Sequence, residues 1–220
     1  MLVFVLLFTV LFSYLFGSMN SAIVVCRIMH GKDIREYGSK NAGLTNVLRT
    51  FGKPTALIML IVDLVKGMAA VFICRALANH FDVEVLSNPL FISYLAGVLV
   101  IVGHIFPCYY GFRGGKGVLL TATTLLAIDP LTCGIALLVF IITVSITKYV
   151  SLSSILGAIT YPVCTIISQT IRDSDKYAKP WQNTLFALAI AVLIIVKHHE
   201  NISRLLSGTE NKLSFKSKKQ

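Results

Sequence analysis

The chain has 220 residues, of which 55% are hydrophobic and only 14% are charged, and its mean hydropathy is +0.78. This composition excludes a soluble globular domain of the same length and indicates an integral membrane protein. The formal net charge of +10 fits an affinity for anionic lipid headgroups and gives no reason to expect nucleic acid as a partner.

Seven apolar segments follow one another along the chain, and most of them reach the roughly 20 residues that a helix needs to cross a bilayer. The first lacks the basic region of a signal peptide and is too long for one, so we interpret it as a span. We expect a single transmembrane domain over residues 1–220, with a basic tail at 208–220. The expected spans of this all-α integral membrane protein are residues 2–27, 54–78, 89–108, 115–129 (the shortest), 130–147, 152–171 and 181–197.

Lysine and arginine gather on one side of these spans, and this asymmetry sets the expected orientation, because such residues are retained in cytoplasmic loops. Fifteen of the 20 fall on one side and four on the other, while Lys66 lies inside the second span. We therefore expect the N-terminus outside and the C-terminus in the cytoplasm. Four polar segments then share the cytoplasmic face, where any chemistry should take place.

The first polar segment, DIREYGSKNAGLTNVLRTFGK, concentrates short hydrogen-bonding side chains around two glycines. With an arginine among them, these groups suit an anionic oxygen better than a metal, which would want clustered carboxylates or histidines. The alternative is a capped amphipathic helix on the membrane surface. The candidate ligand-binding residues here are Ser39, Asn41, Thr45, Asn46 and Arg49.

Two ionisable residues lie three positions apart inside the second apolar segment, Asp63 and Lys66. Charged groups within a span are costly, so both should face the interior of the bundle. We interpret them as a structural ion pair on one helix face.

The second polar segment, GHIFPCYYGFRGGKG, ends in a glycine-rich turn with two cations. Successive amides and a nearby lysine can cradle an anion, although the turn is not a nucleotide-binding P-loop, which would need glycine at Tyr110 and serine or threonine at Gly117. The alternative is a flexible cytoplasmic turn whose cations orient the chain. His104, twelve residues before Lys116, is either a ligand-binding residue or a structural donor.

The last two polar segments are KYVSLSSI and HHENISRLLSGTE. Ser151 and Ser154 open an apolar segment, where N-capping is the alternative to ligand binding. His198 and Asn201 stand three residues apart, so on a continuing helix they project from one face. This pair offers an imidazole that can exchange protons and an amide that can orient a hydroxyl.

Together, DIREYGSKNAGLTNVLR, GHIFPCYYGFRGGKG and HHENISRLLSGTE resemble the bacterial acyl-phosphate:glycerol-3-phosphate acyltransferases of the PlsY type. The resemblance covers nearly the whole chain. It implies seven transmembrane helices in the inner membrane and an active site that faces the cytoplasm. It also implies transfer of a fatty acyl group from acyl phosphate to the sn-1 hydroxyl of glycerol 3-phosphate, giving lysophosphatidic acid and inorganic phosphate.

The resemblance completes the set of candidate residues and partners. The expected partners are acyl phosphate, glycerol 3-phosphate, membrane lipids and an enzyme that supplies acyl phosphate; no metal or cofactor is expected. Glu210 matches a family acid that is more structural than catalytic. The catalytic candidates are Ser39, His198 and Asn201, and the substrate-binding candidates are Asn41, Thr45, Asn46, Arg49, His104, Gly114, Gly115, Lys116, Gly117, Ser151 and Ser154.

Three positions depart from the family pattern, at Asn20 (GSMN for GSIP), Leu44 (GLTN for GATN) and Leu119 (GGKGVLL for GGKGVAT). They leave open whether the chain is a paralogue with an altered substrate. The alternatives to an acyltransferase are a transporter of a phosphate-bearing solute and an inactive scaffold. A transporter should show polar residues spread through the membrane, and a scaffold should have lost polar groups from its motifs.

Both substrates are phosphates and acyl phosphate is already activated, so the enzyme needs anion binding and positioning more than a strong nucleophile. No Ser/His/Asp triad is evident. We therefore expect direct displacement, with Ser39 as a hydrogen-bond donor and with His198 or a substrate phosphate oxygen receiving the proton.

Overall fold

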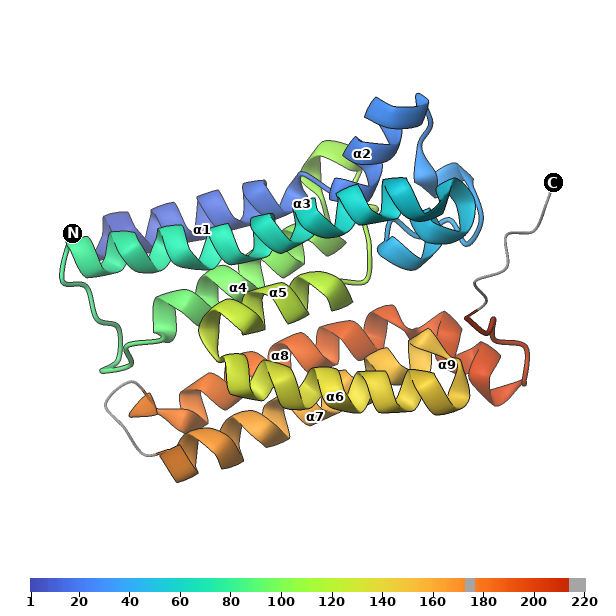
Figure 1. Cartoon of the computed structure of the whole chain (residues 1–220). Coiled ribbons are helices and arrows are strands. Elements are labelled where there is room, and N and C mark those ends of the chain that lie inside the picture. The colour runs from blue at the N-terminus through green and yellow to red at the C-terminus, as the bar shows by residue number, and fades with distance from the viewer. Residues whose placement is uncertain (173–176, 214–220) are drawn as a thin grey trace. The chain divides into compact units, whose positions relative to one another are not determined.

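The computed structural model describes residues 1–172 and 177–213, so residues 214–220 of the expected basic tail lie outside the described part (Figure 1). The chain divides into two compact units. Unit 1 comprises Met1–Val83 and Ile92–Ala127, and unit 2 comprises Glu84–Phe91 and Ile128–Gln220. Each unit is built from helices, as the apolar runs predict.

Unit 1 places its first and third helices antiparallel (Figure 1), and the rings of Phe4 and Phe81 meet edge to face at 6.0 Å where the two helices start and end. Its polar loops consequently gather at the other end. Its complete elements are α1 (Leu2–Ser18), α2 (Ser21–His30), η1 (Ile34–Glu36), α3 (Leu44–His80) and η2 (Cys108–Tyr110). It also contains α4 (Phe91–Ile105) without its first residue and α5 (Val118–Ile128) without its last residue, which belong to unit 2.

The first expected span, residues 2–27, is a broken helix. Asn20 has an extended backbone and accepts a hydrogen bond from the amide of Ile23 (3.2 Å), so it ends α1 and caps α2. Its side-chain amide also donates to the carbonyl of His104 (3.2 Å). The departure from the family pattern at this position therefore has a structural role at the break.

The helix α3 bends where its polar first turns meet its apolar remainder. Gly52 has φ +83° and ψ −175°, a conformation that glycine adopts at little cost. Pro54 follows at the start of the apolar part, where its missing N–H leaves no gap in the helix. A helix covers the whole predicted span at 54–78, and the segment before it is a separate short helix.

The expected ion pair inside α3 is confirmed. Lys66 Nζ lies 3.0 Å from Asp63 Oδ1, and the two side chains are 4% and 0% exposed. Ser21 donates to Asp63 (2.5 Å), and Lys66 also donates to the carbonyl of Met19 (3.2 Å). The pair thus satisfies polar groups that the break between α1 and α2 leaves inside the apolar bundle.

Among the described residues, six helical segments are long and apolar enough to cross a membrane: Leu2–His30, Leu44–His80, Phe91–Tyr110, Pro130–Thr147, Val150–Arg172 and Pro180–Lys197. The predicted span at 115–129 contains only α5, whose 11 residues rise about 16 Å, roughly half of the hydrocarbon thickness. The chain is therefore an all-helical, multi-pass integral membrane protein.

Unit 2 contains α6 (Pro130–Thr147), α7 (Val150–Arg172), α8 (Pro180–Lys197) and α9 (His199–Leu206). The helix α7 packs against both α6 and α8. At one end of the unit, Asp129 accepts hydrogen bonds from Arg172 (2.5 Å) and Gln169 (3.0 Å). Burial raises the pKa of Asp129, but these bonds outweigh it and hold the pKa below its usual value.

Candidate active site

The first polar segment is organised by the side chain of Asn46, which is 4% exposed. Its amide nitrogen donates to the carbonyls of Tyr37 (3.0 Å) and Asn41 (3.1 Å), and more weakly to that of Ile34 (3.4 Å). Its oxygen accepts the backbone N–H of Ser39 (3.0 Å). Because these bonds use both ends of the amide, Asn46 shapes the loop, and its predicted contact with a substrate stays a prediction.

The other candidates of this segment face outward to different degrees. Ser39 and Arg49 are exposed, while Asn41 and Thr45 are half-buried. The hydroxyl of Ser39 makes no hydrogen bond with any residue in the described part of the chain. It can therefore donate to a ligand, which is the role predicted for Ser39.

The glycine loop lies directly on the end of α4. The amide of Gly114 donates to the carbonyl of Ile105 (3.1 Å), and the amide of Gly115 donates to that of His104 (3.2 Å). A Cβ at Gly115 would collide with the imidazole of His104 and with the carbonyl oxygen of Ala42. The two glycines thus permit close packing, and their amides are not free to cradle an anion. The loop offers its cationic side chains instead.

His104 lies beneath this loop and is 4% exposed. Its carbonyl accepts from both Gly115 and Asn20, and its ring touches Gly115. These contacts favour the structural interpretation of His104, as a residue that supports the loop, over direct binding of a substrate.

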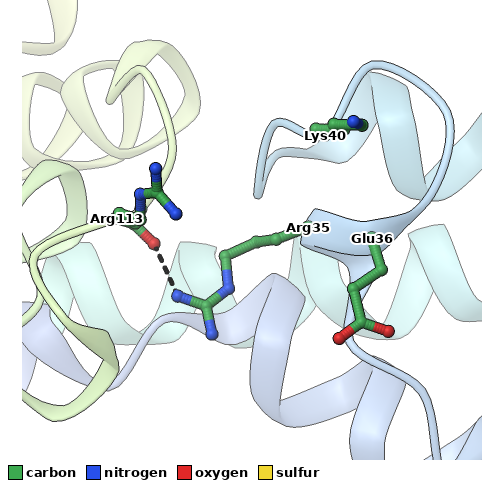
Figure 2. Close-up of a pocket in the computed structure, with 5 residues that line it drawn as sticks. Arg35, Glu36, Lys40 and Arg113 are labelled. Atoms are coloured by element: carbon green, nitrogen blue, oxygen red, sulfur yellow. Dashed lines mark hydrogen bonds between the residues drawn. The ribbon is translucent and has the colours of Figure 1, made fainter.

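A cavity of about 610 Å³ lies where the first polar segment and the glycine loop approach each other. Figure 2 shows Arg35 reaching from η1 to the backbone carbonyl of Arg113, a hydrogen bond of 3.2 Å. Three cations and one carboxylate border the cavity, so its lining is cationic. The lining residues are Arg35, Glu36, Lys40, Arg113 and Gly114.

Leu44, which stands where the family pattern has alanine, packs against the apolar core of unit 1 around Ile23, Ile34 and Val47. This departure is absorbed by the core. Nothing in the structure explains the departure at Leu119.

In unit 2, the carboxylate of Glu210 bonds two of the candidate residues. Glu210 Oε1 accepts from Ser151 (2.9 Å) and Asn201 (2.7 Å), and its Oε2 accepts from Arg204 (2.7 Å). Burial raises the pKa of Glu210, but the bonds from Arg204, Asn201 and Ser151 outweigh it, so the pKa lies below its usual value. Glu210 therefore joins the starts of α7 and α9 as a structural residue, as expected.

His198 lies at the junction of α8 and α9. The helix is interrupted there and does not continue regularly to Asn201. The His198 side chain is buried, with 3% of the residue exposed. Its Nδ1 is 2.8 Å from the carbonyl oxygen of Ile194. A carbonyl can only accept, so Nδ1 carries the proton and Nε2 is the atom that can take up another. Ser154, in contrast, donates its hydroxyl to the carbonyl of Val150 (2.8 Å) within its own helix.

Sequence reasoning missed three residues of the cavity: Arg35, Lys40 and Arg113. Arg113 is one of the two cations of the glycine-rich turn, but of these two only Lys116 was named as a candidate. The charges of Arg35 and Lys40 were used for topology alone. The backbone contacts of Arg35 have no sequence signature, because every residue has a carbonyl.

The chain matches one protein family over most of its length. The family model described as Glycerol-3-phosphate acyltransferase matches residues 7–208. The chain belongs to the glycerol-3-phosphate acyltransferase family. A relative of that name from Mycoplasmopsis synoviae is 40% identical over 213 residues, which cover 92% of each chain.

Two solved structures of the family have the same fold. Both are crystal structures of PlsY, an integral membrane glycerol 3-phosphate acyltransferase. The glycerol 3-phosphate form is 31% identical with a TM-score of 0.76, covering 94% of this chain and 95% of that one. The lysophosphatidic acid form is 30% identical with a TM-score of 0.74, covering 95% of each. The resemblance predicted from the motifs is confirmed, and the enzyme class with it, in preference to a transporter or a scaffold.

Proposed function

We propose that the chain moves a fatty acyl group from acyl phosphate to the sn-1 hydroxyl of glycerol 3-phosphate. The bond between the acyl carbon and the phosphate oxygen breaks as the bond between that carbon and the hydroxyl oxygen forms. The hydroxyl loses its proton, and the products are lysophosphatidic acid and inorganic phosphate. PlsY has been crystallised in a glycerol 3-phosphate form and in a lysophosphatidic acid form, which supports the same acceptor and product here.

The observation that carries this proposal is the cationic cavity between the first polar segment and the glycine loop. Acyl phosphate and glycerol 3-phosphate both carry an anionic phosphate, which charge-assisted hydrogen bonds hold best. We assign phosphate binding to Arg49 and Lys116, with Ser39 as a further donor, because they belong to the two segments that meet at this cavity. The cations of the lining itself, Arg35, Lys40 and Arg113, add to the positive charge there. The loop geometry set by Asn46, Gly114 and Gly115 holds these groups in place.

The proton of the acceptor hydroxyl needs a destination. We assign it to His198 Nε2 or to a phosphate oxygen of the substrate, because the hydrogen bond to Ile194 keeps the proton of His198 on Nδ1. Asn201, held by Glu210, is assigned to orient a substrate hydroxyl through its side-chain oxygen.

A reconstituted reaction tests the proposal. Purified protein in detergent receives palmitoyl phosphate with and without glycerol 3-phosphate, while released phosphate and lysophosphatidic acid are measured. We expect both products only when the acceptor is present, and intact-protein mass spectrometry should show no acyl adduct with acyl phosphate alone. An absence of lysophosphatidic acid in the full mixture would refute the function. A turnover-competent adduct on Ser39 would refute direct displacement alone.

We further propose seven membrane segments with α5 as a short fourth, the N-terminus outside, and the polar segments facing the cytoplasm of a bacterial inner membrane. The bias of lysine and arginine supports this orientation, and the family model, which spans both units, supports one functional domain. An impermeant thiol reagent on intact cells tests it in a cysteine-free background. Glu84→Cys should be labelled and Lys40→Cys should not; the reverse would overturn the orientation. An enzyme that supplies acyl phosphate also stays a proposal.

A further inference from the structure

Asp33 and Arg35 form a planar pair at the start of η1. Arg35 donates from Nε to Asp33 Oδ1 (3.0 Å) and from Nη2 to Oδ2 (2.8 Å), and its backbone N–H also reaches Oδ1 (3.0 Å). The Asp33 side chain is 11% exposed and that of Arg35 is 23% exposed. The fork-to-fork geometry fixes the plane of the guanidinium group.

The remaining end of this guanidinium bonds the backbone of the second polar segment. Nη1 donates to the carbonyl of Tyr110 (2.7 Å) and to that of Arg113 (3.2 Å), 75 and 78 residues further along the chain. One side chain thus joins the segment that carries Ser39 to the loop that carries Lys116. Both lie in unit 1.

The stretch between the two bonded carbonyls has an uncommon backbone. Gly111 has φ +65° and Phe112 has φ +59°, and a bulky residue such as phenylalanine adopts this region only at a cost. The two hydrogen bonds from Arg35 therefore hold the carbonyls on either side of a strained turn, immediately before the glycines.

We propose that Arg35 is a positioning residue for the acyl transfer, which holds the glycine loop and its cations in register with the segment that carries Ser39 and Arg49. The proposal rests on the proposed function, since it assumes that both segments bind phosphate. Arg35 does not act on the reacting atoms. Its loss should therefore weaken substrate binding more than it slows the chemical step.

The role requires arginine. A lysine keeps the charge, but its single ammonium group cannot hold the planar contact with Asp33 and reach two carbonyls on the far side.

Arg27 provides a matched control. It also donates to Asp33 (2.8 Å), and its guanidinium lies 5.4 Å from the centre of the Tyr110 ring, close to the 5.8 Å of Arg35. Within the described part of the chain, the side chain of Arg27 donates a hydrogen bond to Asp33 alone, and it is 50% exposed. Removing Arg27 therefore removes a charge and an ion pair of the same cluster without removing the bonds to the loop.

The test measures KM and kcat for glycerol 3-phosphate in the wild type, Arg35→Ala, Arg35→Lys and Arg27→Ala. We expect Arg35→Ala to raise KM by about tenfold or more, with kcat within about threefold, and Arg35→Lys to restore little of it. Arg27→Ala should stay within about twofold of the wild type. Millimolar guanidinium should lower KM in Arg35→Ala and leave it unchanged in Arg35→Lys, whose side chain fills the site.

A second measurement separates positioning from folding. Glycerol 3-phosphate should raise the Tm of the wild type and of Arg27→Ala, and should raise that of Arg35→Ala much less. A wild-type KM in folded Arg35→Ala, or full recovery in Arg35→Lys, would overturn the inference. If Arg35→Ala does not fold, a wild-type KM in Arg35→Lys overturns it and a raised KM supports it. A wild type without turnover would instead sink the proposed function.

Discussion

The two units hold their candidate residues by different means. In unit 1, side chains bond to backbone: Asn46 holds the loop through carbonyls and an amide, and Arg35 holds the glycine loop through two carbonyls. In unit 2, side chains bond to a side chain, the carboxylate of Glu210. In unit 1 one side chain bonds several backbone groups, so a single substitution at that side chain removes all of these bonds at once. We therefore expect large losses of stability or activity from single substitutions in unit 1. Unit 2 should respond in a graded way, as single partners of Glu210 are removed.

The largest effect should come from Asn46→Ala, because it removes all four hydrogen bonds by which this buried side chain holds the loop. We expect a loss of about 3 kcal/mol or more in stability and near-complete loss of turnover. Thermal unfolding and the phosphate-release assay measure the two. Asn79→Ala, on the exposed end of α3, is the control and should change neither. A stable and active Asn46→Ala protein would contradict the expectation that unit 1 responds more sharply to substitution than unit 2.

Lys116→Ala should separate ligand binding from loop architecture within unit 1. A lost charge-assisted contact to phosphate should cost about 1.5–3 kcal/mol in transition-state stabilisation, seen as a raised KM or lost turnover, while Tm persists. Lys53→Ala, exposed in the same unit, should keep normal kinetics. Full activity in a folded Lys116→Ala protein would refute the assignment.

Gly115→Ala tests the close packing of the loop, since the added methyl group meets the His104 ring and the carbonyl of Ala42. We expect a cost of about 1–3 kcal/mol, with impaired activity, because the loop must shift. Gly134→Ala is the matched control, as a Cβ there meets nothing within 4 Å. Equal behaviour of the two variants would show that the glycine loop is less tightly packed than described.

The smallest effect should follow Glu210→Gln, which keeps the shape of the side chain that bonds Ser151, Asn201 and Arg204 but removes its negative charge. Arg204 is 36% exposed, so screening limits the loss to about 1 kcal/mol. Because the folded pKa of Glu210 is lowered, its contribution is full above the ordinary pKa of about 4.3 and is lost as the pH falls below it.

Unfolding at pH 7 and at pH 3.5 should therefore show a difference between wild type and Glu210→Gln that narrows in acid. Glu200→Gln, whose carboxyl is 70% exposed and 3.8 Å from Arg204, should match the wild type at both values. A difference that widened in acid would contradict the lowered pKa.

Sequence could reach the features whose cause is local. Hydropathy located the long helices, and the spacing of Asp63 and Lys66 predicted their pairing, because residues three apart share a helix face. The break of the first span at Asn20 was not predicted, because the mean hydropathy of an apolar segment hardly changes with one polar residue. The position of the Asn20 side chain also depends on a hydrogen bond to α4, which is distant in sequence. The roles of Asn46 and Arg35 were also beyond reach. Their partners are carbonyls on other segments, and a carbonyl is the same at every position.

The ion pair of Asp63 and Lys66 also bears on how α3 enters the membrane during synthesis. Each isolated charge at the centre of a helix opposes insertion by about 2.5–3.5 kcal/mol. These two groups belong to one helix, one turn apart, and they meet at 3.0 Å. They can neutralise each other as soon as that turn forms, before any neighbouring helix arrives. The helix can thus enter the bilayer with no net charge at this pair. The contacts with Ser21 and Met19 form when the bundle assembles.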